Sequence, residues 1–207
     1  MSRKIFNPVD RLEDLVTAAQ DGAKVGYFYR PIPQYVQPTL DRLKSKPQLI
    51  DIWRVGKRAT LTRARVPNAT AEERFFKRFG NTRATRWLWK DLCRISAAMG
   101  GMGVCVCITR PVPRNETWHV DGWGGRYVLA TYTGMGTHFI PRDKMTPIPD
   151  RPGFFETDED VYYWQAPAGA ITVHHDAVND GTNILHRAPP AELWEDEGRV
   201  IFLLADY

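Results

Sequence analysis

Short segments with alternating apolar residues fill the sequence from Gly103 onward and constrain its fold more than any other feature. Side chains of an extended chain point alternately to the two faces of a sheet, so a period of two predicts β-strands. Turns rich in Gly, Pro, Asn and Asp separate the segments. Many short strands with this punctuation are typical of a β-sandwich or barrel, including the jelly-roll and cupin type. We predict eight strands, at residues 104–109, 117–121, 126–133, 137–140, 161–165, 169–174, 182–186 and 199–205.

The first hundred residues have a different pattern, with apolar residues spaced near 3.6. Thr70 and Glu73 stand at capping-box spacing, which indicates the start of a helix. Residues 50–64 fit either a helix or short strands. The sequence therefore predicts a single α+β domain over residues 1–207. A double-stranded β-helix, which is a cupin-like jelly roll, would occupy residues 101–207, and a mainly helical layer at 1–100 would pack on it. The predicted helical segments are 10–19, 35–43, 74–79 and 85–99.

Length and composition indicate an ordinary globular protein. Hydrophobic residues make up 43% of the 207 residues and charged residues 25%, so a sizeable core can form. No apolar run approaches the roughly 18 residues that span a bilayer, and the first residues lack an apolar stretch of signal-peptide length. Three cysteines are too few for a disulfide framework. We therefore expect a cytoplasmic protein without a membrane partner.

Charge is unevenly distributed along the chain. Residues 1–118 contain 22 Lys and Arg against 10 Asp and Glu, a net charge of +12, whereas residues 119–207 contain 6 against 14, a net charge of −8. The basic region includes an aromatic stretch, Arg74 to Lys90, that could bind nucleic acid through phosphate contacts and stacking. Such a stretch is more often an amphipathic helix whose rings pack on a sheet, and we favour that interpretation.

The predicted strand at residues 117–121 carries the first candidate metal ligands. His119 and Asp121 lie two residues apart, so an extended strand points both side chains to the same face. One imidazole and one carboxylate on one face make two thirds of the facial triad that binds non-haem Fe(II). A third ligand and a place for a co-substrate have to come from elsewhere in the chain.

Two residues farther along the chain extend this pattern. His186 ends the predicted strand 182–186, and Arg199 begins the last apolar strand thirteen residues later. A His-x-Asp pair, a distant His and an Arg beyond it resemble the 2-oxoglutarate/Fe(II)-dependent dioxygenase superfamily. The segments 136–141 and 169–173 also look like strands of that superfamily. The resemblance covers about the last hundred residues, and the whole chain looks most like one of the superfamily's uncharacterised bacterial branches.

The resemblance implies a role for each of these residues. His119, Asp121 and His186 would bind Fe(II) as the catalytic centre and leave three positions open for 2-oxoglutarate and dioxygen, the two co-substrates. Arg199 would bind the distal carboxylate of 2-oxoglutarate, because a guanidinium pairs bidentately and stays charged when buried.

A hydroxyl group on a facing strand often completes the 2-oxoglutarate pocket in this superfamily. Tyr127, Thr131 and Tyr132 could supply it. Thr131 and Tyr132 point to opposite faces of their strand, so at most one of these two can serve.

Several aromatic and imidazole residues near the predicted ligands could line a substrate pocket or belong to the core. His174 is the main competitor of His186 as a ligand, but the spacing from His186 to Arg199 already assigns the distal ligand. His138 could face the cavity or serve packing alone. The candidate pocket residues are Trp118, Trp123, His138, Trp164 and His174.

The predicted activity is that of an oxygenase that hydroxylates its substrate while 2-oxoglutarate is decarboxylated to succinate. The expected substrate is a small molecule or a peptide, and nucleic acid is a less favoured partner. Two alternatives stay open: a cupin-like metalloenzyme that uses the same ligands without 2-oxoglutarate, and a non-catalytic binding module that retains a jelly roll and a vestigial site.

Overall fold

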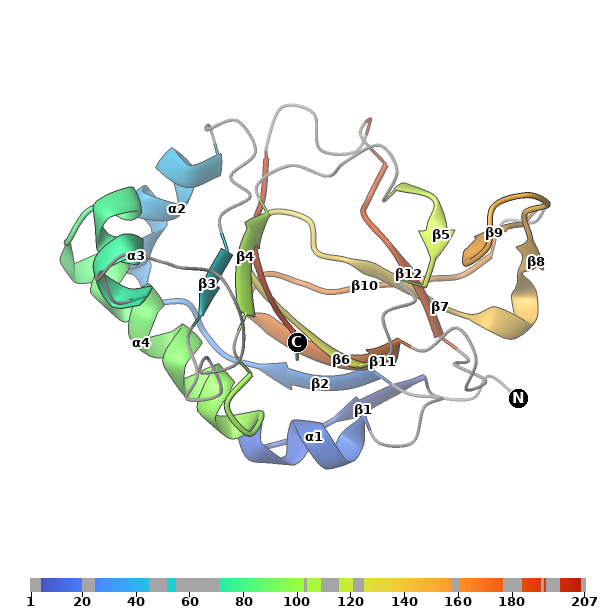
Figure 1. Ribbon diagram of the computed structural model, residues 1–207, viewed down its shortest axis with the longest axis horizontal. Helices are drawn as coiled ribbons and strands as arrows, with labels where there is room; N and C mark the ends of the chain where they lie inside the picture. The colour runs from blue at the N-terminus through green and yellow to red at the C-terminus, as the bar shows by residue number, and fades with distance from the viewer. Residues whose placement is uncertain are drawn as a thin grey trace, which may run out of the picture.

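The computed structural model describes residues 5–19, 25–44, 52–54, 71–102, 104–108, 116–120, 125–157, 161–176, 184–190, 192 and 198–205. These residues form two β-sheets, with helices on the outer side of the larger sheet (Figure 1). The predicted α+β class is therefore confirmed. Among the described residues, no helix is long and apolar enough to cross a membrane.

The larger sheet contains seven described strands, all antiparallel except for the parallel pair β1–β2. In spatial order they are β1 (Phe6–Pro8), β2 (Val25–Tyr29), β11 (Ala170–Asp176), β6 (Gly125–Thr133), β13 (Val200–Ala205), β4 (Val104–Ile108) and β3 (Ile52–Arg54).

The smaller sheet contains six described strands, all antiparallel. In spatial order they are β10 (Trp164–Gln165), β7 (His138–Pro141), β12 (Ile184–Arg187), β5 (Trp118–His119), β9 (Phe154–Glu156) and β8 (Thr146–Pro147). From β4 onward the chain passes repeatedly between the sheets: β4, β6, β11 and β13 lie in the larger one, and β5, β7, β10 and β12 in the smaller one.

Each of the eight predicted strands overlaps one of these observed strands. Of the five further strands, β1, β2, β8 and β9 were not predicted, and β3 lies in residues 50–64, for which short strands were one of two alternatives. β8 and β9 are two and three residues long, and β1, β2 and β3 come from the first hundred residues, which therefore contribute strands as well as helices. β1, β8 and β9 hold too few residues to show a period of two.

Except for the short segment at residues 142–144, the described helical segments lie close to the predicted ones. They are η1 (Leu12–Asp14), α1 (Leu15–Ala18), η2 (Gln34–Val36), α2 (Gln37–Lys44), α3 (Ala71–Phe79), α4 (Arg83–Ala98) and the short η4 (Arg142–Lys144). A capping box starts α4, because Thr82 and Thr85 exchange hydrogen bonds between side chain and backbone. Thr70, the predicted cap of the preceding helix, lies outside the described residues.

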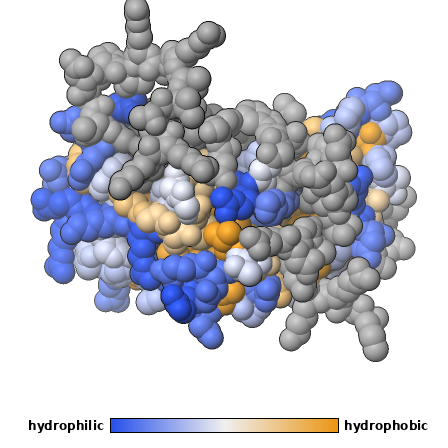
Figure 2. Space-filling view, turned by 60° about the horizontal axis from the view of Figure 1, so that its bottom comes forward, coloured by the Kyte–Doolittle hydropathy of each residue, from blue (hydrophilic) through white to orange (hydrophobic). Residues whose placement is uncertain are grey.

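The helices pack on the outer face of the larger sheet through one large apolar cluster. Phe75 of α3 lies 5.2 Å from Trp89 of α4 and 6.3 Å from Phe202 of β13, measured between ring centroids. The predicted packing of the basic aromatic stretch on a sheet is thus confirmed. The helical layer lies on the left in both overall views, and its outward surface is mainly hydrophilic (Figure 2).

A buried polar triad joins the helical layer to the larger sheet. Asp91 of α4 accepts hydrogen bonds from Arg30 Nε, at 2.9 Å, and from the hydroxyl of Tyr132 on β6, at 2.7 Å. Arg30 Nη1 also donates to the carbonyl of Gly169, at 2.9 Å. Burial, followed by the neighbouring Asp91 carboxylate, raises the pKa of Tyr132 well above its usual value. The pairing satisfies two charges that would otherwise be costly to bury.

The space between the two sheets holds a second apolar cluster and the polar site. Along β6, Val128, Ala130 and Tyr132 belong to the cluster under the helices, whereas Leu129 belongs to the cluster between the sheets. Because side chains alternate, Tyr127 and Thr131 share the inner face with Leu129.

Candidate functional site

Two imidazoles face each other across the antiparallel strands β5 and β12 of the smaller sheet. His119 and His186 are directly paired in register, and their ring centroids are 4.5 Å apart. Both side chains are buried. The hydrogen bond between His119 Nδ1 and the carbonyl oxygen of Thr117 is 2.7 Å long. A carbonyl can only accept, so Nδ1 carries a proton, and in the neutral imidazole Nε2 then carries the lone pair, as in a metal-binding histidine oriented by a backbone carbonyl.

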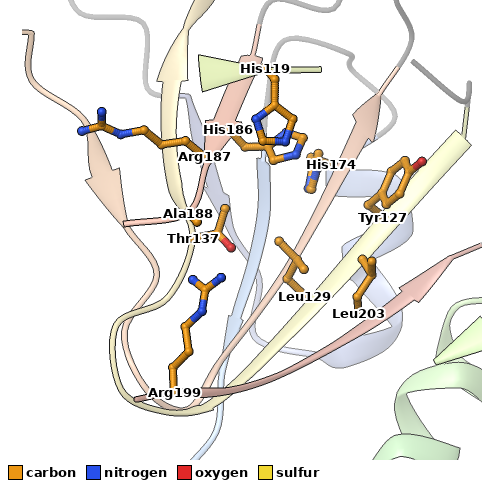
Figure 3. Close-up of a pocket in the computed structure, with 10 residues that line it drawn as sticks. All are labelled: His119, Tyr127, Leu129, Thr137, His174, His186, Arg187, Ala188, Arg199 and Leu203. Carbon is orange, nitrogen blue, oxygen red and sulfur yellow. The ribbon is translucent and has the colours of Figure 1, made fainter. Parts of the chain in front are cut away.

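His174 of β11 contributes a third imidazole from the facing sheet. Its ring centroid lies 4.8 Å from that of His186, and its ring stacks on Tyr127 at 5.7 Å. The edge contact with Phe139 at 5.3 Å fixes the ring from the other side. The structure thus brings His174 into the same pocket as His119 and His186 (Figure 3).

Arg199 lies at the opposite end of this pocket, immediately before β13. Its side chain is only 3% exposed, and among the described residues its Nε and Nη1 atoms make no hydrogen bond. Burial lowers the pKa of Arg199 to about 10, and the Glu116 carboxylate partly opposes this effect. The guanidinium therefore stays charged at neutral pH and is suited to bind an anion. The hydroxyl of Thr137 points toward it (Figure 3).

The pocket that joins these groups is lined from both sheets. It has a volume of about 70 Å³, which is enough for several water molecules. The lining residues are His119, Tyr127, Leu129, Thr137, His174, His186, Arg187, Ala188, Arg199 and Leu203.

The hydroxyl candidates divide between the two faces of β6. Tyr127 lines the pocket, and Thr131 lies on the same inner face with its hydroxyl buried. Tyr132 does not reach the pocket, because it points to the helical layer and donates its hydrogen to Asp91. The structure therefore corrects the prediction that Tyr132 could bind 2-oxoglutarate.

The aromatic candidates lie apart from the pocket where the structure describes them. Trp118 belongs to an apolar cluster on the reverse face of the smaller sheet, and His138 contacts Trp118 and Tyr163 there. Trp164 stacks on Phe6 at 4.1 Å in the cluster between the sheets, away from the imidazoles. Trp123 lies outside the described residues.

The predicted ligand set is therefore present in part. His119 and His186 are adjacent, whereas Asp121 lies outside the described residues. Within the part of the chain that the structure describes, no group of three His, Cys, Asp or Glu residues is arranged to hold a metal ion. Two imidazoles, one with its Nδ1 proton bound to a carbonyl oxygen, fit the two histidine ligands of a non-haem iron site.

The sequence analysis did not single out two polar residues that line the pocket. Thr137 directly precedes His138, and Arg187 directly follows His186, and both histidines were considered. The alternation of side chains shows that Thr137 and His138 lie on opposite faces of their strand. It does not show which of the two faces the pocket, because that depends on the strand register.

Comparison with solved structures reveals a distant likeness. The chain is similar to the protein described as "Apo structure of the Kdo hydroxylase KdoO, a non-heme Fe(II) alphaketoglutarate dependent dioxygenase", with a TM-score of 0.52 and 12% sequence identity. The alignment covers 98% of this chain and 88% of that chain. A likeness at this identity shows a shared fold.

Comparisons of sequence alone give a family and no closer relative. No curated protein matches the chain. A family model described as "Protein of unknown function (DUF1826)" matches residues 9–205, so the chain belongs to the DUF1826 family.

Proposed function

We propose that this protein is an Fe(II)/2-oxoglutarate-dependent oxygenase that hydroxylates its substrate. One observation carries the proposal: a facing pair of buried imidazoles, His119 and His186, shares a pocket with a buried arginine, Arg199. A buried arginine whose Nε and Nη1 donate no hydrogen bond among the described residues is costly unless an anionic ligand pairs with it.

The strand order supports a jelly roll as the scaffold of this site. The strands β4, β13, β6 and β11 are neighbours in the larger sheet, and β5, β12, β7 and β10 are neighbours in the smaller one. The chain moves between two four-stranded layers in this way in a double-stranded β-helix. The fold shared with the KdoO dioxygenase supports the same assignment.

His119 and His186 would bind the iron through their imidazoles, and Asp121 would complete the facial triad. Bound Fe(II) supplies the activation of dioxygen on which a 2-oxoglutarate-dependent hydroxylation depends. The carbonyl of Thr117 accepts the Nδ1 proton of His119 and would thereby leave Nε2 as the nitrogen that binds the metal.

Arg199 would bind the distal carboxylate of 2-oxoglutarate, with Thr137, and Thr131 or Tyr127, as candidate hydroxyl donors. Leu129 and Leu203 line the same pocket with apolar side chains, which helps to exclude water. In the overall reaction, 2-oxoglutarate loses carbon dioxide and becomes succinate. One oxygen atom of dioxygen enters succinate and the other enters a C–H bond of the substrate.

Anaerobic spectroscopy tests this proposal directly. Metal-free protein that receives Fe(II) and 2-oxoglutarate without oxygen should develop a weak visible charge-transfer band. The variants His119→Ala and His186→Ala should lose the band and Fe(II) binding, whereas His175→Ala, whose side chain is next along β11 but absent from the pocket lining, should keep both. Iron binding without the band would reject the use of 2-oxoglutarate.

A cupin-like metalloenzyme that does not use 2-oxoglutarate is the second candidate, and the position of His174 favours it. A third imidazole beside the pair could replace Asp121 in a site of three histidines after a small shift of the rings. Fe(II) titration separates the candidates. Asp121→Ala abolishes binding in the first, whereas His174→Ala abolishes binding in the second.

A further inference from the structure

The strands that carry the site present a second cluster of side chains on the reverse face of the smaller sheet. His119 and His186 point inward, so their chain neighbours Trp118 and Arg187 point outward. The guanidinium of Arg187 is directed away from the imidazoles (Figure 3). We name the group the outer clamp; its members are Trp118 of β5, Arg187 of β12, His138 of β7 and Tyr163, which directly precedes β10.

The members of the outer clamp are in continuous contact. Arg187 Cζ lies 4.4 Å from the ring centroid of Trp118 and 5.4 Å from that of Tyr163. The Tyr163 ring stacks on His138 with centroids 4.2 Å apart. Trp118 and His138 are buried, so the cation–π contact of Arg187 is shielded from water, which strengthens it.

Backbone pairing alone defines the register between β5 and β12 weakly. β5 is two residues long, and His119 paired with His186 is its one residue pair with β12. A slip by one residue would turn one imidazole to the reverse face. Next to the imidazole pair, the antiparallel ladder brings Arg187 opposite Trp118. Their contact therefore favours the register that pairs the two imidazoles.

We propose that Arg187 is a positioning residue: through Trp118, Tyr163 and His138 it clamps β5 to β12 and sets the distance between His119 and His186. The inference deepens the proposed function, since the functional meaning of that distance rests on the proposed metal site. Arg187 is one of the residues that line the pocket, but its guanidinium is directed away from the imidazoles, so in this proposal it acts through its neighbours.

Metal-free protein provides the first test. Wild type should show a nuclear Overhauser cross-peak between the rings of His119 and His186. Arg187→Leu should lose it, because β5 is no longer held. The control Arg83→Leu removes a similar contact, Arg83 Cζ at 4.3 Å from the ring of Tyr35 in the helical layer, and should keep the cross-peak. A cross-peak of equal intensity in wild type and Arg187→Leu overturns the clamp.

Co(II) binding provides the second test, with the visible spectrum and calorimetry as readouts. Arg187→Leu should bind Co(II) about tenfold more weakly than wild type, and Arg83→Leu should bind it equally well. Arg187→Lys keeps the charge but loses the planar stacking surface, so it should fall between the two. If Arg187→Leu does not fold, Arg187→Lys decides, and affinity and cross-peak identical to wild type overturn the clamp. Absence of Co(II) binding in wild type rejects the proposed metal site, while the cross-peak still decides the clamp.

Discussion

Gly134 lies directly against the backbone of Arg199. A methyl group built on Gly134 would stand 2.9 Å from Cα of Arg199 and 2.8 Å from its Cβ, and would also collide with the carbonyl oxygen of Gly198. Gly134 has a φ of +77°, so glycine is required both by the backbone conformation and by the space. The turn after β6 therefore fixes where the arginine enters the pocket.

Gly134→Ala should lower the free energy of unfolding by about 2–4 kcal/mol, because it adds left-handed strain to a steric clash. It should also weaken 2-oxoglutarate binding, since Arg199 has to move. Gly101→Ala is the matched control: φ is +90° but nothing lies within 4 Å of the added methyl group, so a loss of about 1 kcal/mol and unchanged binding are expected. Urea unfolding and calorimetry measure both quantities, and equal losses in the two variants would contradict the close packing on Arg199.

Arg199→Met should separate stability from ligand binding. The buried guanidinium is desolvated, so a methionine of similar length should leave the metal-free protein as stable as wild type or about 1–3 kcal/mol more stable. The same change should weaken 2-oxoglutarate binding about 100-fold, because charge-assisted hydrogen bonds are lost, and leave Fe(II) binding unchanged. Arg126→Met is the control, because Arg126 lies on β6 but does not line the pocket. A variant that binds 2-oxoglutarate as wild type does would remove Arg199 from its assigned role.

Tyr132→Phe should change the stability of the protein, and Thr137→Val should change its affinity for 2-oxoglutarate. Tyr132→Phe removes the hydrogen bond to the buried Asp91 carboxylate, so we expect a loss of about 1.5–3 kcal/mol in the free energy of unfolding with unchanged 2-oxoglutarate affinity. Thr137→Val keeps the shape but removes a hydroxyl that points toward Arg199, so we expect weaker 2-oxoglutarate binding and little change in stability. The reverse result would return Tyr132 to the list of pocket residues.

The core strands and the order of the site residues follow from the sequence, because alternation and turn residues are local signals. The pairing of His119 with His186 joins positions 67 residues apart, and only the strand register brings them together. The same register explains Tyr132: alternation separates it from Thr131, but which of the two faces the other sheet depends on the apolar face of α4 that covers β6.

Trp118 illustrates a signal that was present and unused. It is the chain neighbour of His119, so a strand that points His119 into the pocket has to point Trp118 away from it. The sequence carries no such signal for His138. The face to which it points is set by strand pairing: His138 pairs with Arg187, next to the pair of Phe139 with His186. The position of His174 also depends on contacts between strands, because the Tyr127 ring on which it stacks lies on the neighbouring strand β6.

His138 should make the protein less stable as the pH falls from 6.5 to 4. Burial, helped by the charges of Arg187 and Arg199 and partly opposed by Gln165 on β10, lowers the pKa of His138 from 6.5 to about 4. The unfolded chain binds the proton near pH 6.5, so between the two values only the unfolded state is protonated and the free energy of unfolding rises with pH. The expected loss on acidification is at most about 3 kcal/mol, complete near pH 4. His138→Phe keeps an aromatic ring against Tyr163 without a titrating group, and the other histidines contribute equally to both proteins. Urea unfolding at intervals from pH 7 to pH 4 should therefore show that the free energy of unfolding falls more in wild type than in His138→Phe. Equal falls in the two proteins would show that His138 titrates normally in the folded protein.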